Sequence, residues 1–167
     1  MMALESRLGF PRLGTCITSD GSSFAGQMCG ALPDGFGIGA SKQGDKYAGQ
    51  WRKSNRDGWG CVEYATKGAY HGSFRSNVMD GTGVYTWADG SMYKGQFQAG
   101  LWHGSALFVT KTGTKWFVSY EKGKRVANVP FSGTEAQLLI MKKAEEARVR
   151  RRPPHIRLRL LRVSRQD

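Results

Sequence analysis

The sequence predicts an all-β repeat array: an elongated, twisted antiparallel sheet of about five hairpins, followed by a C-terminal α-helix and a basic extended tail. Three observations support this prediction. Aromatic residues and glycines recur every 23 residues through most of the chain. Glycine, with 23 of 167 residues, is about twice as frequent as in an average protein. The 23-residue period ends after residue 126, where helix-forming residues and then arginines take over.

Each repeat unit begins with an aromatic residue, has a glycine two positions later and usually a second ring four positions later. Such a fixed period is the mark of a repeat architecture in which each unit is one supersecondary element. The opening rings are Phe24, Tyr47, Tyr70, Tyr93 and Trp116, the glycines are Gly26, Gly49, Gly72 and Gly95, and the second rings are Trp51, Phe74, Phe97 and Tyr120. A further glycine block recurs at the same period, at Gly35, Gly58, Gly81 and Gly104.

Side-chain alternation explains what one unit does. In residues 47–51, two rings and a glycine alternate with other residues, so all three face one side of a strand. The glycine leaves bare backbone, against which we expect Trp51, Phe74 and Phe97 to lie from an adjacent unit. The polar segment 52–57 is predicted to be a loop, and residues 58–64 a second strand.

Each unit is therefore one hairpin. Because an isolated hairpin is marginally stable in water, successive hairpins should pair edge to edge into one sheet of about ten strands. The recurring Asp34, Asp57 and Asp80 are interpreted as loop residues that precede glycine. An additional half unit before the first is suggested by Gly14, which lies 23 residues before Gly37.

The unit that begins at Tyr93 (YKGQFQAGLWHG) resembles the MORN repeat, and the unit that begins at Tyr47 is nearly as similar. The resemblance covers about residues 12–122. It implies an elongated sheet of hairpins and a role in assembly, because such repeats occur in radial-spoke and other ciliary proteins, in cytoskeletal proteins and in membrane-junction proteins. This sequence departs from the family pattern where aspartates stand in place of a histidine that only His103 retains, which weakens any expectation of a family-wide lipid-binding surface.

The chain divides into four predicted segments. Residues 1–21 form an N-terminal segment with room for a half repeat, and residues 22–126 form the repeat array. Residues 127–153 form a linker and a helix that Pro153 ends, with capping-box spacing at Thr134 and Gln137 or at Ser132 and Glu135. The helix packs either on the last hairpin or on a partner. Residues 154–167 form the basic extended tail.

Arginine dominates the end of the chain. The net charge is +12, and the segment from residue 148 to residue 165 contains eight arginines and no acidic residue. A cationic excess of this kind attracts acidic protein surfaces, anionic lipid or RNA, or it simply keeps the tail solvated. The arginines predicted to bind a partner are Arg148, Arg150, Arg151, Arg152, Arg157, Arg159, Arg162 and Arg165.

The sequence predicts no enzyme, no metal site, no cofactor and no small-molecule substrate. No nucleophile elbow, zinc-protease motif or phosphate loop occurs, and the three histidines lack ligand spacing. Three cysteines without CxxC spacing favour a reducing compartment. Neither a secretory signal nor a long apolar run is evident, so we expect an intracellular protein.

These observations favour a structural scaffold subunit of a large assembly, in a ciliary or flagellar axoneme or another part of the cytoskeleton. Its partners would be protein subunits with acidic surfaces, tubulin or other axonemal proteins among them. Two alternatives remain open: a peripheral adaptor on anionic phospholipid membranes, and a basic subunit of a ribonucleoprotein or organellar complex.

Overall fold

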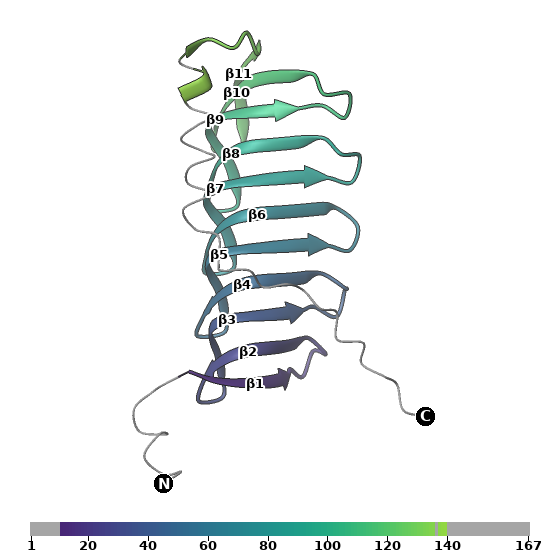
Figure 1. Ribbon diagram of the computed structural model, residues 1–167, viewed down its shortest axis with the longest axis vertical. Helices are drawn as coiled ribbons and strands as arrows, with labels where there is room; N and C mark the ends of the chain where they lie inside the picture. Colours follow the sequence, from purple (N-terminus) through teal and green to yellow (C-terminus); the bar gives the residue numbers. More distant parts are fainter. Residues whose placement is uncertain (1–10, 136, 140–167) are drawn as a thin grey trace.

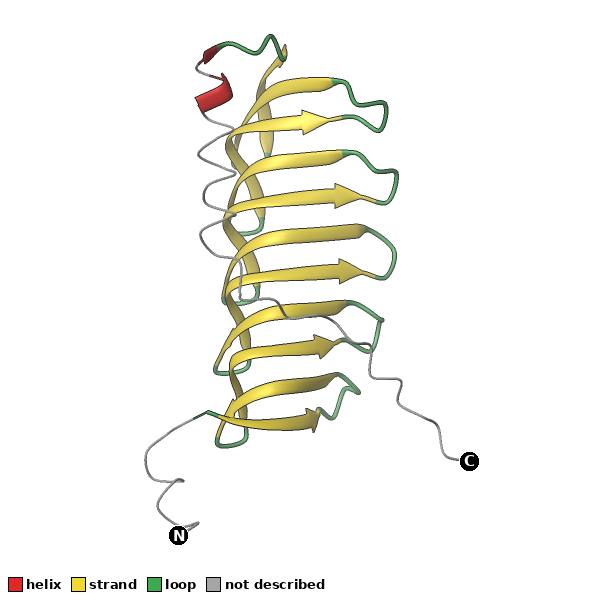
Figure 2. Ribbon diagram, in the orientation of Figure 1, coloured by secondary structure: helices red, strands yellow, loops and turns green. Residues whose placement is uncertain are grey.

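The chain forms one open antiparallel sheet of eleven strands in sequential order (Figures 1 and 2), in a computed structural model that describes residues 11–135 and 137–139. Every strand pairs only with the strands that precede and follow it in the sequence. The strands are β1 (Arg12–Ile17), β2 (Ser23–Cys29), β3 (Leu32–Ala40), β4 (Lys46–Arg52), β5 (Asn55–Tyr64), β6 (Gly68–Arg75), β7 (Val78–Trp87), β8 (Met92–Gln98), β9 (Leu101–Val109), β10 (Lys115–Glu121) and β11 (Lys124–Pro130).

The repeat array confirms the predicted fold class and contains one strand more than expected. Five hairpins, β2–β3 to β10–β11, correspond to the five units, and β1 is the second strand of a half unit, with Gly14 opposite Gly26. At the other end β11 continues to Pro130, beyond residue 126. The half unit therefore accounts for the odd number of strands.

A register shift interrupts each hairpin, at the same position in the first three hairpins and within two residues of it in the last two. The register shifts within β2–β3, β4–β5, β6–β7, β8–β9 and β10–β11, whereas the pairing between successive hairpins is regular. A bulge bends its strand and increases the local twist. Because the bulges recur once per unit, the strands curve together and the sheet forms a long trough (Figure 1).

The predicted loop at 52–57 is wrong, because β4 and β5 are joined by a turn of only two residues. Lys53 and Ser54 both have positive φ, 47° and 66°. Two-residue turns with this geometry suit the twist of a hairpin, and their usual sequence is Asn-Gly or Asp-Gly, which is absent here. Here the previous hairpin holds the turn, since Ser54 N–H donates to the carbonyl of Pro33 at 2.8 Å.

The three recurring aspartates are strand residues that clamp the next hairpin, not loop residues as predicted. The carboxylate of each accepts a hydrogen bond from the first turn residue of the next unit: Asp34 from Lys53 at 3.2 Å, Asp57 from Ser76 at 3.3 Å and Asp80 from Ala99 at 3.2 Å. The side chain thus satisfies an amide that the positive-φ turn would otherwise leave to solvent. Sequence spacing alone does not reveal this contact between hairpins.

The predicted C-terminal helix lies mostly outside the described residues. Glu135 and residues 137–139 are helical, and Leu138 N–H donates to the Thr134 carbonyl at 2.9 Å. The Gln137 side chain accepts a hydrogen bond from the backbone of Ser132 at 3.2 Å, so it turns back onto the residues before the helix.

Candidate functional site

A continuous ladder of rings runs along one face of the trough. Edge-to-face contacts with centroids 4.9–5.8 Å apart join neighbouring rings. Each second ring bridges two units; Phe74, for example, contacts both Tyr47 and Tyr70. In order, the ladder is Phe24, Trp51, Tyr47, Phe74, Tyr70, Phe97, Tyr93 and Tyr120.

Burial of the ladder places it on the inside of the bend. Tyr70 is completely inaccessible to solvent, and Tyr93 is 1% exposed. A flat single layer would leave one side of each ring in water, so the curved sheet must wrap around them. Edge-to-face ring pairs add about 0.5–1.5 kcal/mol each beyond the burial of their area. In the described part of the chain, the ladder is therefore the hydrophobic core of a single-layer sheet.

The glycines lie under the rings, but mostly under rings of their own unit. A Cβ on Gly72 would lie 2.6 Å from Cζ of Tyr70, and a Cβ on Gly49 would lie 2.6 Å from Oη of Tyr47. The expectation that Phe74 and Phe97 cover glycines of an adjacent unit is therefore wrong for Gly72 and Gly95. Trp51 does reach back one unit, since its ring lies against Gly39 of β3.

The two ends of the array depart from this pattern. Gly26 lies under the ring of Phe24, which has no hydroxyl group. In the fifth unit Val118, 1% exposed, fills the glycine position, so the ladder continues through Tyr120 while Trp116 packs half-buried at its side.

The tyrosine hydroxyls hold the bulges. Tyr47, Tyr70 and Tyr93 each donate to the carbonyl of the residue three positions later, at 2.9–3.0 Å. Burial raises the pKa of all three phenols far above the usual value, since the phenolate would be cut off from water. These groups are thus structural donors, and none is poised for acid–base chemistry near neutral pH.

The side chain that covers the ladder at one equivalent position differs in chemical type from unit to unit. Arg56 holds its guanidinium 5.7 Å from the ring centre of Tyr47 and 5.4 Å from that of Phe74. The same position is Met79 in the next unit and Trp102 in the one after, where the indole stacks on Tyr93 at 5.7 Å. The cover is cationic near the N-terminal end of the trough and aromatic near the C-terminal end.

Beyond the ladder, a second group of rings is only half buried. The group comes from β5, β7 and β9, and its ring centres are 4.9–6.3 Å apart. On β7 these rings alternate with Val84 and Thr86 and so share the face of the ladder. We call this group the aromatic shelf: Tyr64, Tyr85, Trp87, Trp102 and Phe108. Half-buried rings with polar tips are enriched where proteins meet partners.

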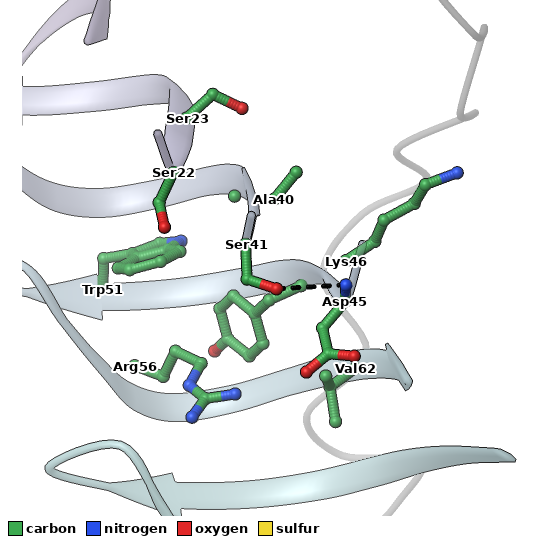
Figure 3. Close-up of a pocket in the computed structure, with 11 residues that line it drawn as sticks. Ser22, Ser23, Ala40, Ser41, Asp45, Lys46, Trp51, Arg56 and Val62 are labelled. Atoms are coloured by element: carbon green, nitrogen blue, oxygen red, sulfur yellow. Dashed lines mark hydrogen bonds between the residues drawn. The ribbon is translucent and has the colours of Figure 1, made fainter. Parts of the chain in front are cut away.

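A hollow of about 220 Å³ interrupts the face near the N-terminal end. Its walls include Trp51, Val62 and Arg56, and the close-up in Figure 3 shows Ser22, Ser41 and Asp45 among the side chains around it. A second hollow, of about 320 Å³, lies between Gln43 and residues 64–67. Both volumes are at or below the lower end of the range for pockets that hold drug-sized ligands.

A cysteine and a histidine meet on the opposite face, which the spacing in the sequence did not indicate. Cys61 Sγ lies 3.4 Å from His71 Nε2 because the two residues are register partners across β5 and β6. Burial, with the nearby Glu63 charge, raises the pKa of this thiol to about 11, which opposes nucleophilic use. Within residues 11–135 and 137–139, no three His, Cys, Asp or Glu side chains gather as a metal site would require.

The predicted partner-binding arginines, from Arg148 onward, lie outside the described residues. Among the helical residues that are described, none belongs to a helix long and apolar enough to cross a membrane.

The repeat itself has a counterpart among known families. A family model of the MORN repeat matches residues 47–68, 70–92 and 93–115. Residues 47–115 are three MORN repeats. These MORN repeats correspond to hairpins β4–β5, β6–β7 and β8–β9, and the flanking hairpins share their architecture. No curated protein sequence matches the chain. MORN repeats are generally non-enzymatic and suggest a scaffold role or interaction with proteins or membranes.

Proposed function

We propose that this MORN-repeat chain is a non-enzymatic scaffold subunit of a large assembly, a ciliary or flagellar axoneme or another cytoskeletal structure. It binds partner proteins through the aromatic shelf and through the arginine-rich tail. The observation that carries the proposal is the shelf itself. Five rings remain partly exposed on the inner face of a sheet that has no second layer of strands among its described residues. Such a patch is an interaction surface more often than a neutral one.

Charge supports the same proposal. Residues 148–167, which include the end of the predicted helix and the tail, contribute eight arginines, whose planar guanidinium groups bind carboxylates in pairs of hydrogen bonds. Acidic protein surfaces such as that of tubulin offer these carboxylates in high density. The tail's charge alone would also suit anionic phospholipid or RNA, so both remain alternatives to be separated by experiment.

The test is binding of the full chain to purified axonemes at rising salt. A double variant, Tyr85→Thr with Trp87→Thr, removes two shelf rings that are neighbours on the same face of β7. The matched control is Phe36→Thr with Ile38→Thr, which removes two apolar side chains, 38% and 39% exposed, from the other face of β3. We expect binding that persists at high salt, that the shelf variant loses and that the control variant keeps.

Two outcomes would overturn the assignment. Flotation of the full chain with liposomes only when acidic lipid is present, without binding to axonemes, would support a membrane adaptor. Association that a nuclease abolishes would support a ribonucleoprotein subunit. Equal binding by the shelf and control variants would remove the shelf from the proposal.

A further inference from the structure

The 220 Å³ hollow borders a position at which the first unit lacks the ring that the next two units carry. This position is Ser41 in the first unit, Tyr64 in the second, Trp87 in the third and Thr110 in the fourth. Two residues earlier the first unit has Gly39, where the later units have Val62, Tyr85 and Phe108, but the ring of Trp51 already lies on Gly39. The second and third units thus fill with Tyr64 and Trp87 the kind of space that Ser41 leaves open. The hollow is a vacant ring position beside Trp51.

The floor and walls of the hollow are fixed by interactions of their own. The Trp51 ring lies on Gly39, and its indole N–H donates to the Gly37 carbonyl at 3.2 Å. Trp51 also packs edge-to-face against Tyr47 at 5.1 Å. Val62, 1% exposed, closes the apolar side. A ring that entered would find these groups in place and would cost little rearrangement.

A cation stands at the edge of the hollow without a carboxylate partner. Arg56 is positioned over two rings and donates to the Asn77 carbonyl at 2.9 Å. The two ion pairs among the described residues are Arg52–Asp57 and Arg75–Asp80, so neither involves Arg56. Lys46 adds a second cation at the rim, while the single acid there, Asp45, already accepts a hydrogen bond from Ala65 at 3.0 Å.

We propose that this hollow receives one aromatic side chain of a partner protein, with a carboxylate next to that ring paired to Arg56. The volume suits a single large side chain better than a whole small molecule. The partner's ring would lie between Trp51 and Val62, and its carboxylate would be attracted by the net positive charge at the rim of the hollow. The inference rests on the proposed function, because it names the chemistry by which the inner face of the trough recognises a partner.

The probes are three small compounds observed by NMR with the full chain. N-acetyl-phenylalanine carries both ring and carboxylate, its amide carries the ring alone, and N-acetyl-alanine carries the carboxylate alone. We expect saturable shifts of the Trp51 indole N–H and of the amides of residues 40–46 with the first probe. The amide probe should bind about tenfold more weakly, which corresponds to about 1.4 kcal/mol. N-acetyl-alanine should cause no such shifts.

The variants use residues that the neighbouring units already accommodate. Ser41→Tyr places the equivalent of Tyr64 in the hollow and should abolish binding of the ring probe. Arg56→Met copies Met79 and should reduce the binding of N-acetyl-phenylalanine to that of its amide. The control Thr110→Tyr adds a ring at the equivalent position far along the array and should leave binding unchanged.

Each alternative result overturns the proposal. Undiminished binding by the Ser41→Tyr variant would show that the probe binds elsewhere. Equal binding of N-acetyl-phenylalanine and its amide would show that the carboxylate takes no part in recognition. Absence of binding at the solubility limit of the probe sinks the whole inference. A negative result with these probes does not affect the axoneme experiment with the shelf variants. The two proposals are therefore tested independently.

Discussion

At the scale of single residues, the glycines of the inner face are defined by what lies on them. Gly72 sits under Tyr70 and opposite Gly83, and a Cβ added to it would lie 2.7 Å from the Cα of Gly83. Since that contact is with backbone as well as a ring, a flexible side chain cannot simply move aside. The aromatic residue and the two glycines therefore form one packing unit, which recurs in the hairpins β2–β3, β4–β5 and β6–β7.

Substitution of Gly72 by valine should destabilise the array by on the order of 1–3 kcal/mol, as overpacking of a core does. The physical reason is displacement of Tyr70, not of Phe74. The measurement is chemical denaturation followed by circular dichroism, with Ala25→Val, which places valine on the exposed face of β2, as the control. Identical midpoints for the two variants would show that Tyr70 does not need the space.

At neutral pH the hydroxyls of Tyr47, Tyr70 and Tyr93 are both hydrogen-bonded and protected from ionisation. Burial raises the pKa of each far above the value of about 10 for a free phenol. An unfolded chain releases these protons near pH 10 while the folded chain retains them. The folded state is therefore fully stabilised below about pH 10 and loses stability as the pH rises further.

We expect the array to unfold in alkali above about pH 10, with a slope of up to roughly 1.4 kcal/mol per pH unit for each buried tyrosine. A triple variant with phenylalanine at the three positions should lose part of this slope, and its stability at neutral pH should fall because the bulge carbonyls lose their donors. Denaturant unfolding at several alkaline pH values, followed by circular dichroism, gives the slope of the unfolding free energy against pH. The same alkaline slope in both proteins would mean that the three phenols do not control it.

At the scale of elements, hairpins are joined by contacts that link the turn of one to a strand of the previous one. The Asp57 carboxylate accepts from Ser76 N–H and lies 3.6 Å from a guanidinium nitrogen of Arg52. In the fourth unit His103 takes the place of the aspartate, and its buried Nδ1 has no hydrogen-bond partner. The junction between β9 and the β10–β11 turn thus lacks the clamp that the other three junctions have.

Replacing His103 by aspartate should therefore stabilise the C-terminal end of the array by about 0.5–1.5 kcal/mol, the usual contribution of one hydrogen bond. The new carboxylate would accept from Lys122 N–H, which is equivalent to Ala99 in the previous unit. The variant Asp57→Ala should destabilise its own junction by a similar amount, because it removes the equivalent hydrogen bond. Hydrogen exchange at the two turns resolves the effects locally, and a slower exchange at residue 122 in wild type than in the variant would contradict the clamp.

The same elements show what a sequence can and cannot reveal. The hairpins and the facing of Tyr47, Gly49 and Trp51 follow from a period of 23 and a strand alternation of two, both visible in one chain. The two-residue turn at Lys53–Ser54 could not be predicted, because its positive φ values are stabilised by Asp34 and Pro33 of another unit. The missing ring at Ser41, by contrast, could have been predicted, because a comparison of the units position by position shows Tyr64 and Trp87 at the equivalent positions.

At the scale of the whole molecule, the array is nearly one-dimensional. Strands pair only with their neighbours in sequence order, and the ring contacts reach only the next hairpin, so stability is approximately a sum over hairpins and the junctions between them. The terminal strand β11 is exposed along its full length and belongs to the degraded fifth unit. A sheet of this kind depends little on segments that follow it, so the array and the basic tail can be separated by deletion.

Deletion of residues 148–167 should leave the array folded and remove the protein from its assembly. The deleted segment carries eight arginines and one acid, Asp167, a net charge of +7 out of the +12 of the whole chain. Its alternating Ile156, Leu158 and Leu160 predict docking as an extended strand with one apolar side. The measurement is incorporation of the truncated chain into axonemes, beside its circular dichroism spectrum. Normal incorporation would assign binding to the sheet alone, whereas a full-length association that falls steeply with salt and is lost on nuclease treatment would assign the tail to RNA, since neutralised phosphates release counterions.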